Sequence, residues 1–96
     1  MSVNTEVEAP SSQNEQYLAS LWSEIIGIDR EQLRLPSKFL EVGGNSLTLN
    51  IILTRIESET GAAMEPEWFF DDEKSTLYAL AQELDQLAAA PRAQAQ

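Results

Sequence analysis

A serine follows two glycines at the start of an apolar, helix-patterned run, in the stretch Phe39-Leu-Glu-Val-Gly-Gly-Asn-Ser-Leu47. Gly43 and Gly44 permit a positive φ or a close approach of the backbone to another group. Either Asn45 or Ser46 can cap the helix that begins here. The first N–H groups of a helix have no partner within it, and the helix macrodipole is positive at that end. A phosphate attached to Ser46 would therefore be stabilised, which makes Ser46 the candidate functional residue.

Two residue types on which much enzyme chemistry depends are missing from this chain of 96 residues. It has no histidine and no cysteine, so the usual general base, the commonest metal ligands and disulfide bonds are all excluded. An esterase built on Ser46 would lack the histidine that activates the nucleophile in a serine triad. If the protein carries acyl groups as thioesters, the sulfur must come from a cofactor.

The chain is strongly acidic. Sixteen acidic and six basic residues give a formal net charge of −10, which opposes binding to nucleic acid or to an anionic membrane. The same charge favours partners with basic docking faces, and it equally serves solubility. No apolar run approaches the roughly 20 residues of a membrane span, and the first residues do not have the pattern of a signal peptide. We therefore expect a cytoplasmic protein.

Three long apolar stripes with helical spacing indicate three helices that must position the serine. We expect these helices over about residues 13–27, 46–60 and 76–90. Ser12 and Glu15 have the spacing of a capping box, and Gly27 and Gly61 are natural helix stops. The residues expected to face the core are Leu18, Leu21, Trp22, Ile25, Leu49, Ile52, Leu53, Ile56, Leu77, Leu80, Ala81, Leu84 and Leu87.

The segments between these helices also contain recurring apolar residues. In the connection from residue 28 to residue 45 they predict several contacts with the core, and residues 31–33 predict a helical turn. The apolar residues concerned are Ile28, Leu33, Leu35, Phe39, Leu40 and Val42. Pro66 and the following residues 67–70 predict a short helix with proline first, whose aromatic side chains fill the core while one faces outward.

These elements predict an all-α fold, a small four-helix bundle with three long helices and one short helix. The length allows one domain, which we expect over residues 13–90, with flexible tails at residues 1–12 and 91–96. Met1 and the single domain fit a free-standing protein, and they fit equally well a piece of a larger assembly line.

One face of the helix at residues 46–60 carries apolar side chains that the core does not need. Leu47 and Ile51 are four residues apart and lie on the same face, next to Thr54 and Arg55 one turn later. Exposed apolar clusters often mark docking surfaces, so we expect these four residues to form a partner surface beside Ser46. Seven acidic residues between Arg55 and Lys74 would attract basic partners to this end of the domain.

The chain resembles a thiolation domain, that is, a peptidyl carrier domain of nonribosomal peptide synthesis with an acyl-carrier-like fold. The resemblance spans about residues 15–88. It rests on Leu21-Trp22, Ile25-Ile26-Gly27, the stretch at residues 39–47, Leu77 and Leu80-Ala81. It implies that Ser46 receives a 4′-phosphopantetheine arm from coenzyme A, and that the arm holds acyl or aminoacyl cargo as a thioester.

The resemblance also implies partners and a mode of loading. A phosphopantetheinyl transferase would bring coenzyme A and supply the base and the metal, and the Ser46 oxygen would attack the β-phosphate. An adenylating or loading enzyme and condensation or tailoring enzymes would follow, with the carrier as a monomer that is a substrate and not an enzyme. The chain departs from the family at Ile51, where a polar or basic residue is commoner, and at residues 71–76, which lack the usual proline.

Two other functions are compatible with these residues. A polyketide or fatty-acid acyl carrier would use the same chemistry, and the acidity favours it, whereas the glycine pair and Leu21-Trp22 favour the peptidyl type. A cofactor-free helical interaction module would instead bind a partner through the face of Leu47 and Ile51. The loading of a phosphopantetheinyl group distinguishes the carriers from the interaction module.

Overall fold

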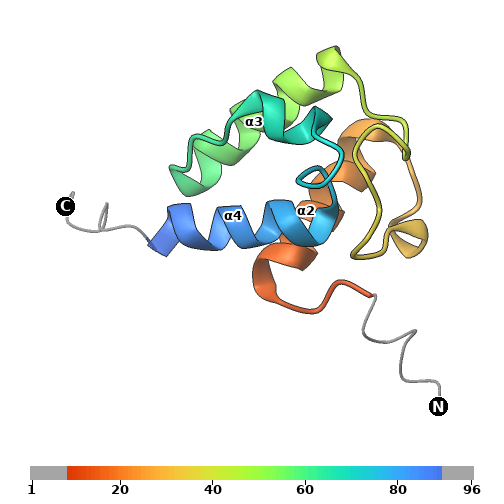
Figure 1. The fold of residues 1–96 in the computed structure, drawn as a ribbon, viewed down its shortest axis with the longest axis horizontal. Coiled ribbons are helices and arrows are strands. Elements are labelled where there is room, and N and C mark those ends of the chain that lie inside the picture. Colours follow the sequence, from red (N-terminus) through yellow and green to blue (C-terminus); the bar gives the residue numbers. More distant parts are fainter. Residues whose placement is uncertain (1–8, 90–96) are drawn as a thin grey trace.

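The computed structural model describes residues 9–89 and shows an all-helical domain (Figure 1). Its α-helices are α2 (Gln13–Ile26), α3 (Ser46–Thr60) and α4 (Leu77–Ala89), and two short 3-10 helices, η1 (Arg30–Gln32) and η2 (Pro66–Phe70), lie in the connections. No strand forms within residues 9–89, where Lys38 and Thr76 make only an isolated bridge. The all-α prediction is confirmed. The count of four helices is not confirmed, because the short segment at Pro66 is a 3-10 helix.

The ends of α2 follow the capping signals in the sequence. The Ser12 hydroxyl accepts a hydrogen bond from the Glu15 N–H at 3.2 Å, and the Glu15 carboxylate accepts one from the Ser12 N–H at 3.0 Å. Gly27 ends the helix with φ of 90°, a conformation that glycine adopts without a steric penalty. The predicted capping box and helix stop are therefore both present. Residues 1–8 and 91–96 of the predicted tails, and residue 90 at the end of the predicted domain, lie outside the described residues.

The core is built where α2 packs against α3 and α4. Trp22, Phe39 and Phe69 are fully buried and meet edge to face, with ring centroids 5.5 Å apart for Trp22 and Phe39 and 5.3 Å apart for Phe39 and Phe69. Such pairs contribute about 0.5–1.5 kcal/mol beyond their buried area. Trp22 is thus a core residue, as its place in the apolar stripe predicts, and among residues 9–89 its indole N–H has no hydrogen-bond acceptor.

The other predicted core residues of the helices are buried or half-buried. The fully or nearly fully buried ones are Leu18, Leu21, Leu49, Ile52, Ile56, Leu77, Leu80, Ala81 and Leu84, and those packed at the margin are Ile25, Leu53 and Leu87. In η2 the Phe69 side chain is buried, Trp68 is half-buried and Phe70 is 45% exposed, so one aromatic side chain faces outward as expected.

The connection between α2 and α3 is attached to the core at most of the predicted positions. Leu33 and Phe39 are fully buried, and the half-buried Ile28, Leu35 and Val42 pack against the core. The prediction that Leu40 contacts the core is wrong, because its side chain is 50% exposed. It lies in a tight turn in which the neighbouring Phe39 takes the inward position. The 3-10 helix η1 forms at the predicted turn.

Backbone hydrogen bonds attach the same connection to the start of α4. The Phe39 N–H donates to the Ser75 carbonyl at 3.1 Å, and the Leu77 N–H donates to the Ser37 carbonyl at 2.9 Å. Thr76 caps α4 by accepting a hydrogen bond from the N–H of the third helical residue at 3.1 Å. The connection is therefore held to α4 close to where α3 begins.

The link between η2 and α4 lacks proline but forms a turn around Asp71. The Asp71 carboxylate accepts hydrogen bonds from the N–H groups of Glu73 at 2.9 Å and Lys74 at 2.8 Å, and these bonds lower the pKa of Asp71. Lys38 forms an ion pair with Asp72 at 2.8 Å across the same region. These contacts fix the start of α4 without the proline.

Acid titration should show how much the capping box of α2 contributes to stability. Burial alone would raise the pKa of Glu15, but hydrogen bonds from the N–H groups of Ser12 and Ser11 together lower it below its ordinary value of 4.5. A lowered folded pKa stabilises the fold above the unfolded pKa, and this contribution is lost as the pH falls through the folded pKa. We expect Glu15→Gln to cost about 1 kcal/mol at pH 7, or roughly 4–8 °C in Tm.

The measurement is the Tm from thermal unfolding followed by circular dichroism between pH 7 and pH 3. The difference between the wild type and Glu15→Gln should shrink towards acid pH. Glu57→Gln, at an exposed position of α3, serves as the control. A difference that stays constant over this pH range would contradict the role of the Glu15 charge.

Candidate functional site

The candidate site lies where the α2–α3 connection meets the N-terminus of α3. Asn45 is the N-cap: its side-chain oxygen accepts a hydrogen bond from the Thr48 N–H at 2.9 Å, and the Thr48 hydroxyl accepts one from the Asn45 N–H at 2.9 Å. The sequence left Asn45 and Ser46 open as caps, and the structure assigns the role to Asn45. Ser46 is the first residue of the helix, and its side chain is not needed as the cap.

Ser46 is exposed and its hydroxyl makes no hydrogen bond within residues 9–89. The N–H groups of Ser46 and Leu47 belong to the first turn of α3, where no helical carbonyl can accept from them, and Asn45 takes only the N–H of Thr48. Two backbone donors and the positive end of the helix dipole therefore lie next to the hydroxyl. The arrangement favours an anionic group on Ser46.

The two glycines before the helix are required for different reasons. Gly43 has φ of 105°, in the region that glycine adopts most easily. Gly44 lies against the Phe39 ring, and a methyl group in its place would lie 2.4–2.6 Å from three atoms of that ring. The Gly44 N–H also donates to the Phe39 carbonyl at 2.9 Å. This turn places the start of α3 directly over a buried aromatic side chain.

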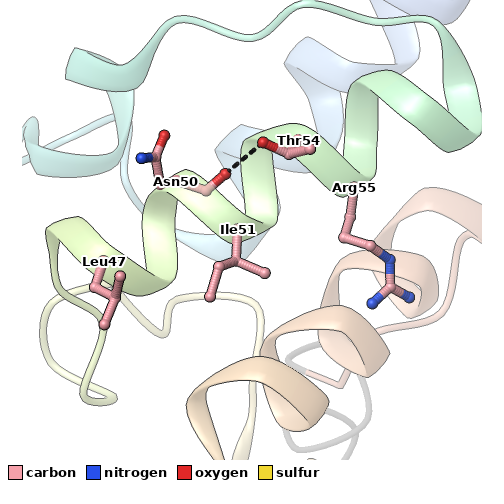
Figure 2. Close-up of a pocket in the computed structure, with 5 residues that line it drawn as sticks. All are labelled: Leu47, Asn50, Ile51, Thr54 and Arg55. Carbon is pink, nitrogen blue, oxygen red and sulfur yellow. Dashed lines mark hydrogen bonds between the residues drawn. The ribbon is translucent and has the colours of Figure 1, made fainter.

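The predicted partner surface forms a shallow hollow along α3, shown in Figure 2, with a volume of about 350 Å³. The residues that line it are Leu47, Asn50, Ile51, Thr54 and Arg55. Leu47 is 72% exposed and Ile51 is 44% exposed, so both apolar side chains face outward as the sequence predicts. Sequence reasoning missed Asn50, although its position between Leu47 and Thr54 on the same helical face was a sufficient signal.

Arg55 lies at one end of this hollow, and its charge is already paired. Its guanidinium donates to the carboxylates of Glu24 at 3.2 Å and Glu59 at 3.1 Å, which raises the pKa of Arg55. The Tyr17 hydroxyl donates to Glu59 at 2.6 Å, and this bond, together with Arg55, lowers the pKa of Glu59. Burial, followed by the bond to Glu59, raises the pKa of Tyr17. Figure 2 shows the guanidinium pointing away from Leu47 and Ile51.

Within residues 9–89, no three acidic side chains gather closely enough to hold a metal ion. Over the same range, every helix is too short or too polar to cross a membrane.

Comparison with known proteins identifies the family. The family described as "Phosphopantetheine attachment site" matches residues 16–84. The chain is 33% identical over 81 residues to surfactin synthase subunit 1 of Bacillus subtilis, and 32% identical over 78 residues to gramicidin S synthase 2 of Brevibacillus brevis. These matches cover 84% and 81% of this chain but only 2% of either synthetase, so the chain spans a small part of the length of these relatives.

A solved structure shares the fold. It is described as "Structure of the Phosphopantetheine Transferase Sfp in Complex with Coenzyme A and a Peptidyl Carrier Protein", and the match has a TM-score of 0.73 at 23% identity. It covers 82% of this chain and 97% of the matched chain. The chain therefore belongs to the phosphopantetheine attachment family, as a carrier domain of the kind found in nonribosomal peptide synthetases, and its prosthetic group is 4′-phosphopantetheine.

The close approach of Gly44 to the Phe39 ring makes a testable prediction. Gly44→Ala should destabilise the fold by about 1–3 kcal/mol, because a fully buried ring cannot move aside without disturbing its neighbours. Gly27→Ala is the matched control, since Gly27 has a positive φ but no atom within 4 Å of an added methyl group. It should cost about 1–2 kcal/mol through backbone strain alone.

The free energy of unfolding in urea measures both effects. The HSQC spectrum should also separate the two variants, since only Gly44→Ala should shift the resonances of Phe39 and of the first turn of α3. An unchanged stability in Gly44→Ala would show that the connection does not depend on this contact.

Proposed function

We propose that Ser46 is the attachment point of the 4′-phosphopantetheine arm, and that this domain holds acyl or aminoacyl cargo and passes it between biosynthetic enzymes. The observation that supports this most directly is the exposed hydroxyl of Ser46, free of hydrogen bonds within the described chain, at the first position of α3. The residues present fit the group. The N–H groups of Ser46 and Leu47 would bind its phosphate, and the arm, once bound, supplies the thiol that forms the thioester.

Loading would be a group transfer from coenzyme A. The Ser46 oxygen forms a bond to the β-phosphorus, the bond between that phosphorus and the bridging oxygen of the pyrophosphate breaks, and adenosine 3′,5′-bisphosphate leaves. The hydroxyl proton passes to a base on a phosphopantetheinyl transferase, which also supplies the metal. The task of this chain is to present the hydroxyl, so the domain is a substrate and carrier and not itself an enzyme.

The carrier function also implies domain bounds, a location and a set of partners. We propose a monomeric carrier domain at residues 13–90, in which η2 is the short fourth helix of the bundle, acting in the cytoplasm. Its partners would be the transferase, an adenylating or loading enzyme, and condensation or tailoring enzymes. Nucleic acid and membranes are not among them, because the net charge of −10 repels polyanionic surfaces.

We also propose that these partners dock on the hollow along α3. Leu47 and Ile51 supply exposed apolar area next to Ser46, and Thr54 and Arg55 continue the same face. Because Glu24 and Glu59 both pair with Arg55, the charge of this three-residue cluster sums to −1. A partner residue that approaches this end of the hollow is therefore better matched if it is basic.

Replacing the hydroxyl tests the attachment point. Wild-type protein incubated with coenzyme A and a promiscuous phosphopantetheinyl transferase should gain the mass of one phosphopantetheinyl group in intact-protein mass spectrometry. Ser46→Ala should gain nothing and should melt within about 0.5 kcal/mol of the wild type, because Asn45 provides the cap. Ser58→Ala, at an exposed position on the same helix, is the control and should load normally. Full loading of Ser46→Ala would refute the assignment.

A charge placed in the hollow tests the docking surface. Leu47→Glu should lower kcat/KM of the transferase for this carrier by about tenfold, equivalent to about 1.4 kcal/mol, because a desolvated carboxylate replaces an apolar contact. Its Tm should change little, since Leu47 is 72% exposed. Gln86→Glu adds the same charge at an exposed position of α4 that does not line the hollow, and it should change kcat/KM less than twofold. Equal effects of the two variants on kcat/KM would show that the net charge of the carrier, and not the hollow, determines the rate, which would contradict the docking surface.

A further inference from the structure

A second groove lies on a part of the domain that the proposed carrier function does not use. It has a volume of about 380 Å³ and is lined by Ala9, Pro10, Arg30, Glu31, Leu33 and Arg34. Ala9 and Pro10 are half-buried and form one wall, and the fully buried Leu33 lies beneath. The groove shares no residue with the hollow along α3. Figure 1 shows α3 across the top of the domain, with the start of the described chain and η1, which contribute residues to the groove, below it.

The charge of this groove is opposite to that of the molecule. The chain has six basic residues against sixteen acidic ones, and two of the six line this one groove. Lys38 and Arg55 each pair with a carboxylate, but neither Arg30 nor Arg34 forms an ion pair within residues 9–89. With Glu31 included, the lining carries a net charge of +1.

The two guanidinium groups are held by backbone carbonyls and have no carboxylate partner within residues 9–89. One nitrogen of Arg34 donates to the carbonyls of Glu31 and Leu33, and one nitrogen of Arg30 donates to the Gln16 carbonyl at 3.3 Å. A guanidinium has five N–H donors, so each arginine keeps donors for a further acceptor. The carbonyl contacts also limit the rotamers of both side chains, which reduces the entropy lost when a carboxylate binds.

We infer that this groove is a docking site for an acidic peptide segment of a partner protein, with a carboxylate between Arg30 and Arg34 and an apolar side chain against Pro10. Charge complementarity points to this partner, because the forked donors of arginine fit carboxylates. A long polyanion such as nucleic acid is a poor match, since the rest of the chain repels it. The apolar wall of Ala9 and Pro10 favours a peptide over a free inorganic anion.

This inference goes beyond the proposed carrier function and does not depend on the attachment of a group to Ser46. Because the groove and the hollow along α3 have separate linings, an acidic segment can occupy the groove while Ser46 stays accessible. The groove then gives the domain a point of attachment that persists while the α3 face exchanges enzymes. Such a second contact raises the effective concentration of the partner at the α3 face.

The test is a titration of the 96-residue protein, without the phosphopantetheine arm, followed by ¹⁵N HSQC spectra at low salt. The probe is an acetylated and amidated hexapeptide, Glu-Glu-Leu-Glu-Glu-Leu, and the matched control peptide has glutamine in place of every glutamate. Chemical shift changes should centre on residues 9–10 and 30–34. Binding should weaken as salt is raised from about 25 to about 300 mM, because exposed charge pairs are screened.

Three variants make the result decisive. Arg30→Gln should raise the Kd about threefold, as expected for an exposed charge pair, and Glu31→Gln should lower it. The Arg30 side chain is exposed and donates to the Gln16 carbonyl, so its loss leaves the fold intact, which the HSQC spectrum itself reports. Lys74→Gln removes an exposed cation elsewhere and should leave the Kd unchanged.

Several outcomes would overturn the inference. These are shift changes centred on α3, equal binding of the glutamine peptide, equal Kd values for Arg30→Gln and the wild type, and no saturation at millimolar peptide. Ser46→Ala should bind the peptide normally even though it cannot be loaded. Peptide binding and loading are therefore measured separately, so a groove that does not bind the peptide is distinguished from a serine that is not the attachment point.

Discussion

The contact between the Phe39 ring and Gly44 determines where α3 begins, and the position of Ser46 follows from it. Phe39 is fully buried and packs edge to face against Trp22 of α2 and Phe69 of η2. The ring thus joins one residue from the first helix, one from the second connection and the backbone just before α3. Any side chain at Gly44 would push α3 away from this ring. The core of the domain and the exposed site are linked through a single residue.

The surface of the domain is divided between features of opposite charge. The N-terminus of α3 is positive, and it faces solvent beside apolar side chains in a chain with a net charge of −10. At the other end of the same face, Glu24 and Glu59 pair with Arg55 and leave a net charge of −1, and the Tyr17 hydroxyl joins Glu59 to α2. A phosphate is therefore favoured at one end and a basic partner residue at the other. The basic groove around η1 lies apart from both and suits an acidic segment.

Much of the fold could be predicted from local signals in the sequence. The capping residues Ser12 and Glu15 and the stops Gly27 and Gly61 set the helix ends, because their effects act within one turn of the chain. The exposure of Leu47 and Ile51 followed from helical spacing alone. The glycine pair marked the site, but the sequence could not tell that Gly44 is required by an aromatic ring, since this depends on packing between distant segments.

The features that escaped prediction depend partly on tertiary contacts and partly on local turns. Leu40 turns outward because Phe39 occupies the inward position, and the link after η2 is closed by the Asp71 carboxylate in place of a proline. The pairing of Arg55 requires α2 to lie beside α3. The family match shows a phosphopantetheine carrier domain, and the similarity to peptide synthetases favours the peptidyl type among the chemistries that the residues left open.

The most direct test of this account is to locate the attached group on the loaded protein. After incubation with coenzyme A and a phosphopantetheinyl transferase, the protein is digested and every serine-containing peptide is sequenced by tandem mass spectrometry. The account predicts that the added mass lies on Ser46 alone, because that hydroxyl is exposed at the positive end of α3. The same mass on another serine, with Ser46 unmodified, would contradict it.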